Sequence, residues 1–299
     1  MSKGVQITLA IPTYNRREVV CSLVEAIVPQ LQAGDELLVV DDGSQDSTAD
    51  ALRAVPQVRL LVHDTNQGMV ETWNTCLVSA TRDWICIVHD DDTIAPDALA
   101  TIRRACSIAN EPALISLNEV GTNIDSRFRY SVLEPGPWAM LHYRGVPSGL
   151  TVHREIVATL GTFDKRFTYS TDLEYFPRIS AQYKTIVIES PHVLNYNQHN
   201  SNYQYKTWQQ PDFLDQLQEI EQLVMHYTGL SEAITMSWKR ERWIAYITHM
   251  FYHSARINDK TVLRKTSQLL RRQSGITRRL RVYANIAAVF GWVPSWFRP

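Results

Sequence analysis

Residues 84–92, Trp-Ile-Cys-Ile-Val-His-Asp-Asp-Asp, decide the fold prediction for this chain. The apolar run 84–88 is typical of a strand buried inside a parallel sheet. The three carboxylates that follow repel one another, a cost that a divalent cation offsets because Mg²⁺ and Mn²⁺ take oxygen ligands. Ligands of open α/β sheets bind at this carboxyl end of the strands. The alternative is a solvated turn in which Asp92 caps the helix that begins near residue 96.

Strand and helix signals alternate on either side of this stretch. Apolar runs predict strands at 5–11, 37–40, 58–62 and 84–88, and helical periodicity predicts helices at 18–31, 47–53, 68–79 and 96–108. This alternation predicts right-handed βαβ units and a parallel sheet covered by helices on both faces.

The pattern changes after residue 111. Shorter signals predict strands at 114–120, 127–132 and 184–188. Residues 149–153 lead into a predicted helix at 154–160, a second helix is predicted at 171–182, and the last ninety residues show helical periodicity without strands. We therefore expect one α/β domain over 1–205, made of halves 1–110 and 111–205, and a helical, basic extension over 206–299.

Composition indicates a soluble globular protein, with 44% hydrophobic and 20% charged residues among 299. The four cysteines, at 21, 76, 86 and 106, show neither pairing nor metal-ligand spacing and are expected to be reduced core residues. The N-terminus lacks the apolar segment of a signal peptide, and no run approaches the ~20 apolar residues of a membrane span. These features predict a cytoplasmic protein.

Positive charge is concentrated at the C-terminus although the net charge is only −1. Residues 256–299 contain ten Lys/Arg and one acidic residue, Asp259. Basic and apolar residues alternate from Arg278 to Tyr283, and Trp292, Trp296 and Phe297 follow, which favours a helix lying on an anionic membrane. The alternative is that these aromatic residues pack on the protein while the arginines are solvated. Nucleic acid is not expected as a partner, because no recognised binding module accompanies the charge.

Four polar, turn-prone segments follow predicted strands, namely 12–16, 41–44, 66–68 and 89–92. Each has a structural explanation as a turn or a strand stop. In a parallel sheet they lie along one edge, where together they would supply the donors, acceptors and charges that a polar ligand and a metal need.

The order of these segments resembles the nucleotide-binding half of the inverting family 2 glycosyltransferases with the GT-A fold. The matching motifs are Ile-Pro-Thr-Tyr-Asn-Arg at 11–16, Val-Asp-Asp-Gly-Ser-Gln-Asp-Ser-Thr at 40–48, Asn-Gln-Gly at 66–68 and Asp-Asp-Asp-Thr-Ile-Ala-Pro-Asp at 90–97. The last is similar to the DxD motif of the family. The resemblance covers about residues 5–200 and implies a Rossmann-like, mostly parallel sheet flanked by helices, here with a C-terminal helical extension.

The resemblance also implies a set of site residues. Thr13, Tyr14 and Asp41 would hold nucleobase and ribose, Asp90 would contact ribose or sugar, and Asp91 would ligate Mg²⁺ or Mn²⁺ on the diphosphate. Asp92 is a second ligand or a helix cap, and His199 would reach the diphosphate or the metal. The nucleotide-sugar site as a whole would comprise Pro12, Thr13, Tyr14, Asn15, Arg16, Asp41, Asp42, Asn66, Gly68, Asn74 and Asp90.

Two residues depart from the pattern of the family. His89 stands where many members have a carboxylate, and Trp73 stands where many have an arginine before the asparagine matched by Asn74. The base of the donor therefore stays open among UDP-, dTDP- and GDP-sugars. We expect Trp73 to be a core residue, and His89 and His153 to be structural.

The acceptor half resembles the family at 148–154, 160–164 and 170–178. Asp172 matches the general base, which removes the proton of the acceptor hydroxyl as that hydroxyl attacks C1 opposite the leaving diphosphate. Thr171 replaces a glutamate usual in relatives, so we expect Asp172 to be more acidic than a paired carboxylate. Glu174 is the substitute base, and a helix cap is the structural alternative for Asp172.

These residues predict an inverting, metal-dependent glycosyltransferase of surface polysaccharide synthesis, at the inner face of the cell membrane. Its acceptor would be a glycan or a lipid-linked oligosaccharide. A nucleotidyltransferase is the first alternative, but it would show a glycine-rich, basic loop where residues 12–15 read Pro-Thr-Tyr-Asn. A non-catalytic scaffold is the second alternative, and Asp91 and Asp172 argue against it.

Overall fold

The computed structural model describes residues 4–117, 128–136, 139, 148–190, 193–195, 210, 212–228, 244–273 and 276–292. The chain forms two compact units, residues 1–198 and 199–299. His199 and residues 231–243 of the helix predicted at 231–254 lie outside the described residues.

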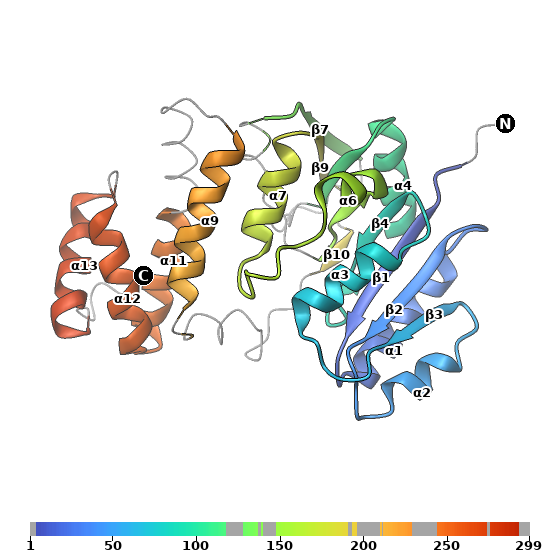
Figure 1. The fold of residues 1–299 in the computed structure, drawn as a ribbon, viewed down its shortest axis with the longest axis horizontal. Helices are drawn as coiled ribbons and strands as arrows, with labels where there is room; N and C mark the ends of the chain where they lie inside the picture. Colours follow the sequence, from blue (N-terminus) through green and yellow to red (C-terminus); the bar gives the residue numbers. More distant parts are fainter. Residues whose placement is uncertain are drawn as a thin grey trace. The chain divides into compact units, whose positions relative to one another are not determined.

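The first unit is built on an eight-stranded sheet in the order β3-β2-β1-β4-β8-β6-β9-β7 (Figure 1). Its strands are β1 (Ile7–Thr13), β2 (Glu36–Asp41), β3 (Val58–Val62), β4 (Trp84–Ile87), β6 (Ala113–Leu117), β7 (Arg129–Leu133), β8 (Thr151–His153) and β9 (Lys184–Ser190). The first four strands run parallel, and β6 is parallel to β9. β8 is antiparallel to both β4 and β6, and β7 is antiparallel to β9, so the sheet is mixed but mostly parallel, as the sequence predicts. The short strands β5 (Thr93–Ile94) and β10 (Leu194–Asn195) pair separately.

Helices cover both faces of this sheet because successive strand residues point to opposite sides. They are α1 (Arg17–Ile27), α2 (Thr48–Arg53), α3 (Met69–Ser79), α4 (Ala98–Ala109), α6 (Arg154–Leu160) and α7 (Asp172–Ser180). Leu37 and Val39 of β2 pack in the core that includes α1 and α4. Leu38 and Val40 pack in the opposite core with α3, α6 and α7. This two-sided burial explains why the central strands read as continuous apolar runs.

The first helix is shorter than its sequence pattern predicts. Periodicity extends to Leu31, but α1 ends at Ile27 and a 3₁₀ turn, Val28–Gln30, follows. Pro29 lies in that turn and has no N–H to donate to the preceding helical turn, so the α-helical bonding stops there.

The second unit is helical in its described residues, which form α9 (Phe213–Thr228), α11 (Ala245–Arg256), α12 (Lys260–Arg272) and α13 (Arg278–Phe290). Asp259 caps α12 by accepting hydrogen bonds from the backbone N–H groups of Thr261 and Val262, both at 3.0 Å. The apolar side of α12, with Val262, Leu263, Leu269 and Leu270, is buried. Among the helices that the structure describes, none is long and apolar enough to cross a membrane.

Candidate functional site

The carboxyl ends of β1, β2 and β4 meet at one edge of the sheet. Thr13, the last residue of β1, is in register with Asp41, the last residue of β2, and the backbone N–H of Asp42 donates to Thr13 O at 2.9 Å. On the other side of β1, Thr13 Oγ1 donates to Asp90 Oδ2 at 2.8 Å. Three of the four polar segments singled out in the sequence therefore lie side by side.

Arg16 links two of the three consecutive aspartates. Its Nη1 donates to Asp90 Oδ1 at 2.7 Å and to Asp91 Oδ2 at 2.8 Å. Burial raises the pKa of Asp90, and the neighbouring Arg16 only partly opposes that shift. Burial by itself would lower the pKa of Arg16, but the two carboxylates outweigh it and raise that pKa. The guanidinium thus stays charged and binds both acids.

Asn15 joins the loop after β1 to the loop after β2. It has a left-handed backbone conformation with φ of 50°, which asparagine tolerates better than most residues. Its N–H donates to Ser44 Oγ at 2.8 Å, and its Oδ1 accepts from the N–H of Gln45 at 2.7 Å. Tyr14, just before it, is 43% exposed. The loop is therefore held by Asn15 and presents the Tyr14 ring to solvent.

Asp41 is buried but only one of its oxygens is used within the described residues. Oδ1 accepts from the N–H of Ser44 at 3.1 Å and from the Ser44 hydroxyl. Oδ2 is buried and has no hydrogen-bond partner in the part of the chain that the structure describes. A buried carboxylate oxygen of this kind is an acceptor for an N–H or O–H group of a ligand.

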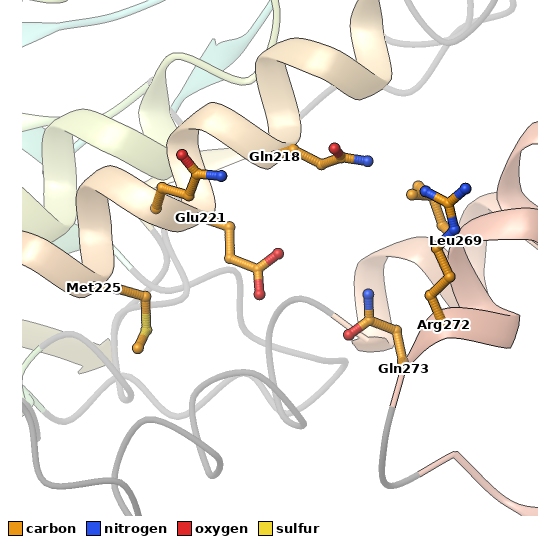
Figure 2. Close-up of a pocket in the computed structure, with 7 residues that line it drawn as sticks. Gln218, Glu221, Met225, Leu269, Arg272 and Gln273 are labelled. Carbon is orange, nitrogen blue, oxygen red and sulfur yellow. The ribbon is translucent and has the colours of Figure 1, made fainter.

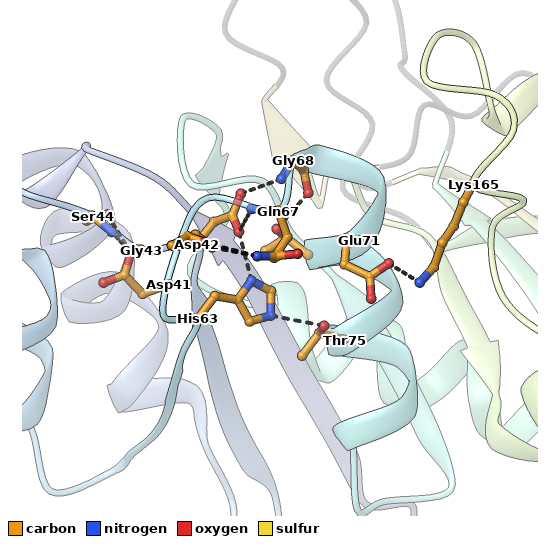
Figure 3. Close-up of polar contacts among 12 residues, drawn as sticks. Asp41, Asp42, Gly43, Ser44, His63, Gln67, Gly68, Glu71, Thr75 and Lys165 are labelled. Atoms are coloured by element: carbon orange, nitrogen blue, oxygen red, sulfur yellow. Dashed lines mark hydrogen bonds and ion pairs between the residues drawn. The ribbon is translucent and has the colours of Figure 1, made fainter.

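Asp42, by contrast, organises the loop that leads into α3 (Figure 3). Its Oδ1 accepts from the N–H of Gln67 at 2.8 Å and lies 2.7 Å from His63 Nδ1. Its Oδ2 accepts from the N–H of Gly68 at 2.9 Å. Gly68 has φ of 89°, a conformation that side-chain-bearing residues rarely adopt, and it precedes the first residue of α3. Asp42 therefore positions this loop, while Asn66 within it is exposed.

His89, Asp91 and Asp92 form a cluster able to hold a metal ion, with one ligand atom from each lying within 4.8 Å of the others. Burial lowers the pKa of His89 to about 4, so its imidazole is neutral and has a lone pair for a metal. The Nε2 of His89 is buried and has no hydrogen-bond partner among the described residues. One imidazole nitrogen and two carboxylates suit Mn²⁺, and with water also Mg²⁺.

His89 was expected to be structural, and its place in this cluster is what the sequence interpretation missed. The signal was its position between a buried strand and three aspartates. Its ring stacks on Trp73 of α3, with centroids 5.1 Å apart and planes 18° apart. Trp73 is 4% exposed, as expected for a core residue, and it also orients the imidazole.

Asn74 is committed to the backbone of the acceptor half. Its Nδ2 donates to Phe163 O and its Oδ1 accepts from the N–H of Phe163, both at 2.9 Å. A nearby ion pair between Glu71 of α3 and Lys165 connects the same two segments (Figure 3). These contacts fix the loop 161–165 against α3.

Asp172 is the first residue of α7 and is half-buried. Burial raises the pKa of its carboxyl to about 6, against the opposing effect of its own N–H and that of Leu173. The absence of a second carboxylate, which the sequence expectation considered, is thus not the main influence on this pKa, because loss of hydration raises it. A carboxylate with this pKa is suited to accept a proton near neutral pH.

Glu174, the substitute base in the sequence interpretation, is buried in an ion pair. Its Oε1 lies 2.9 Å from Arg178 Nε and its Oε2 accepts from Arg178 Nη2 at 3.0 Å. Arg178 also donates to the backbone oxygens of Leu160 at 2.5 Å and Thr162 at 2.7 Å. Glu174 therefore holds Arg178 in place, and Asp172 is the better candidate for a base.

The second unit has a polar groove between α9 and α12 (Figure 2). It is lined by Gln218, Glu221, Gln222, Met225, Leu269, Arg272 and Gln273. None of the site residues predicted from sequence lines this groove, and we assign it no role.

Comparison with known proteins finds one family model and curated relatives, each of which covers part of this chain. Residues 8–116 match the family model of Glycosyl transferase family 2. The succinoglycan biosynthesis protein ExoO of Rhizobium meliloti is 31% identical over 130 residues, which are 42% of this chain and 37% of that protein. The PGL/p-HBAD biosynthesis glycosyltransferase of Mycobacterium bovis is 24% identical over 194 residues, 61% of this chain and 75% of that protein. The match to the first of these relatives thus spans little more than a third of its length.

Solved structures share the fold at low identity. TarS residues 1–349 of S. aureus, in complex with UDP-GlcNAc, match with a TM-score of 0.69 and 13% identity over 96% of this chain and 89% of that one. The mannosyltransferase PcManGT from Pyrobaculum calidifontis, in complex with GDP-Man and Mn²⁺, matches with a TM-score of 0.52 and 16% identity, covering 97% of this chain and 88% of that one.

Proposed function

Because this chain is a family 2 glycosyltransferase with the GT-A fold, we propose that it moves a sugar from a nucleotide-diphosphate sugar to a hydroxyl of a glycan or lipid-linked acceptor, with inversion. The observation that carries the proposal is the convergence of three strand ends, joined by the hydrogen bond from Thr13 to Asp90. Relatives named for succinoglycan and PGL/p-HBAD biosynthesis support a role in surface polysaccharide or glycolipid synthesis.

The donor site is proposed along this edge. The buried Oδ2 of Asp41 would accept from an N–H of the nucleobase, and the exposed ring of Tyr14 would stack on it. Asp90 would contact the ribose or the sugar. Pro12, Asn15, Asp42, Gly68 and Asn74 would act by holding the loops in place rather than through a reacting group. The exposed Asn66 would contact the donor without supporting the loop. The UDP-GlcNAc and GDP-Man complexes of the structural neighbours support a nucleotide-sugar donor without deciding its base.

We propose His89, Asp91 and Asp92 as the residues that hold Mn²⁺ or Mg²⁺. A bound divalent cation would stabilise the negative charge that develops on the leaving diphosphate. The predicted fourth ligand, His199, lies outside the described residues and stays a prediction. The neutral imidazole of His89 supplies a nitrogen ligand that the sequence pattern of aspartates alone would lack.

Asp172 is proposed as the general base. Its carboxylate would take the proton of the acceptor hydroxyl as the new bond to C1 forms, and its raised pKa makes it a stronger base than an exposed aspartate. Glu174 and Arg178 would keep the start of α7 in position through the carbonyls of residues 160 and 162.

The second unit is proposed to contact the anionic inner face of the cell membrane. From residue 256 to residue 292 the described residues include nine Lys/Arg and a single acid, Asp259. Exposed apolar side chains accompany that charge on and beside α13, at Val282, Val289, Phe290 and Trp292. Positive charge with aromatic side chains is the combination that binds the interface of anionic lipids, where a lipid-linked acceptor would lie.

A donor panel tests the proposed activity. The purified protein is incubated with Mn²⁺ and UDP-, dTDP- or GDP-sugars, and release of nucleoside diphosphate is measured. We expect one donor class to be consumed, and Asp91→Asn to abolish release. Asp50→Asn, at an exposed aspartate of α2, is the matched control and should retain activity. The scaffold alternative would be favoured by two results together. The protein would release nucleoside diphosphate from none of the donors, and it would bind none of the three nucleotides.

A further inference from the structure

Arg16 places a permanent positive charge on the carboxylates that are proposed to serve donor and metal. One nitrogen, Nη1, binds both Asp90 Oδ1 and Asp91 Oδ2, at 2.7 and 2.8 Å. A guanidinium does not lose its proton in proteins, so this charge leaves the carboxylates only if the side chain moves.

The backbone on both sides of Arg16 is fixed. The N–H of Asn15 donates to Ser44 Oγ at 2.8 Å, and the N–H of Arg17 donates to Asp46 Oδ2 at 3.0 Å. Arg16 O accepts the first hydrogen bond of α1, from the N–H of Val20 at 3.0 Å. The side chain itself is 37% exposed, so part of it borders solvent and not protein. Motion of the guanidinium therefore does not require motion of the loop.

A cation bound by His89, Asp91 and Asp92 would share the carboxylate of Asp91 with this guanidinium. Two positive groups on one carboxylate repel each other, and each lowers the negative charge available to the other. A diphosphate beside the metal would reverse this balance, because its oxygens offer Arg16 a bidentate partner of higher charge than a carboxylate.

We propose that Arg16 couples metal binding to donor binding, by occupying Asp90 and Asp91 until a diphosphate draws its guanidinium away. This inference rests on the proposed function, and it adds that Mn²⁺ binding depends on the presence of the nucleoside diphosphate. The protein binds Mn²⁺ weakly by itself and much more tightly together with a nucleoside diphosphate. Arg16 is then a positioning residue, which acts by controlling access of the metal to Asp91.

The test measures binding and does not depend on turnover. The dissociation constant of Mn²⁺ is determined by electron paramagnetic resonance, without nucleotide and with saturating UDP, GDP or dTDP, whichever raises the melting temperature of the protein most. Arg16→Gln is expected to bind Mn²⁺ alone about fivefold or more tightly than the wild type, a factor at the lower end of measured couplings. The factor by which the nucleotide strengthens Mn²⁺ binding should fall correspondingly. Arg17→Gln, which removes a neighbouring exposed charge, should leave both quantities unchanged.

Unchanged or weaker binding of Mn²⁺ alone to Arg16→Gln would overturn the coupling, and weaker nucleotide binding on its own would mean that Arg16 only contacts the diphosphate. Arg16→Gln leaves the buried carboxylate of Asp90 without its cation, which could prevent folding. In that case the double variant Arg16→Gln, Asp90→Asn removes this charge too, and tighter binding of Mn²⁺ alone is again expected. If the wild type binds none of the three nucleotides, the proposed function fails, whereas nucleotide binding without an effect of Arg16 overturns the coupling alone.

Discussion

The side-chain amide of Asn74 and the backbone of Phe163 exchange two hydrogen bonds, each 2.9 Å long. This pair connects α3, which begins after the loop bound by Asp42, to the loop that precedes α7 and Asp172. Both groups are buried, so removing the amide leaves a backbone N–H and a carbonyl unpaired inside the protein.

We expect Asn74→Ala to lower the free energy of unfolding by about 2–6 kcal/mol, because each of the two unpaired buried groups costs about 1–3 kcal/mol. Urea denaturation followed by circular dichroism measures this loss. Asn66→Ala, at an exposed asparagine, is the control and should change stability by less than about 0.5 kcal/mol. Equal stability of the two variants would contradict the role given to Asn74.

The pKa of Asp172 sets the expected pH dependence of transfer. A general base works only when deprotonated, so kcat/KM should fall about tenfold per pH unit below the pKa of about 6 and level off above it. Asp172→Asn should lower kcat by about 10²–10⁴-fold without weakening nucleotide binding. A profile that stays flat down to pH 5 would exclude Asp172 as the base.

Asp172 should also reduce stability at neutral pH. Its folded pKa is raised from 3.8, so the protonated carboxyl favours the folded state below pH 3.8, and that contribution is lost as pH rises through about 6. Asp172→Asn should therefore be more stable than the wild type at pH 7.5, by on the order of 2 kcal/mol. The difference should shrink at pH 4. Melting temperatures measured at the two pH values check it.

Glu174 is an acidic residue of α7 that pairs with Arg178, whereas Asp172 is the proposed base. Replacing it with Gln removes the charge that pairs with Arg178, so Glu174→Gln should lower the free energy of unfolding by about 3 kcal/mol, the cost of breaking a buried pair. The midpoint of its pH–rate profile should stay near 6. If Glu174→Gln shifts this midpoint and Asp172→Asn does not, Glu174 is the base and Asp172 is the structural acid.

The sequence was sufficient to predict β1, β2 and β4, because these strands are continuous apolar runs that lie inside the sheet. The strand predicted at 58–62 is β3 to the residue. The antiparallel insertion of β8 between β4 and β6 was not predicted, since pairing partners depend on contacts distant in sequence.

The sequence predicted where the polar residues of the candidate site lie better than it predicted the contacts of their side chains. Sequence motifs brought Thr13, Asp41 and Asp90 to one edge, but they did not reveal that Asp42 is engaged by the loop 63–68. They also treated Trp73 and His89 as two unrelated departures from the family pattern. In the structure these two rings stack, so a neutral pair stands where many members carry an arginine and a carboxylate. No single-residue pattern shows such a pairing.

His89 gives a direct test of the metal site. Chelation by EDTA should abolish sugar transfer and added Mn²⁺ should restore it. His89→Asn should weaken Mn²⁺ binding about tenfold or more, as loss of a ligand or its support typically does. His153→Asn, at the histidine that caps α6, is the matched control and should bind Mn²⁺ like the wild type. Similar Mn²⁺ affinities for both histidine variants would remove His89 from the ligand set.

Packing within the second unit limits the proposed membrane contact to a few side chains. The apolar side of α12 is buried within the second unit, so the amphipathic pattern of this helix is explained by packing. Arg279 lies over the Tyr283 ring, and Arg281 donates to the backbone oxygens of Arg271 and Gln273, so these two arginines also serve the fold. The side chains left for the proposed lipid contact are the exposed ones at the C-terminal end of α13 and the exposed basic ones of α12.

Phe290 and Trp292 are the side chains with which to test that surface, since they are 62% and 50% exposed and their ring centroids lie 6.4 Å apart. We expect Phe290→Ser with Trp292→Ser to lose most binding to sedimented vesicles that contain phosphatidylglycerol, because insertion of the rings is removed while the charge is kept. Residual binding should be abolished by high salt, which screens the remaining arginines. Val78→Ser, at a 67% exposed valine of α3, removes an apolar side chain in the other unit and should bind vesicles like the wild type. If both variants bind as the wild type does, the exposed rings of Phe290 and Trp292 do not face a membrane.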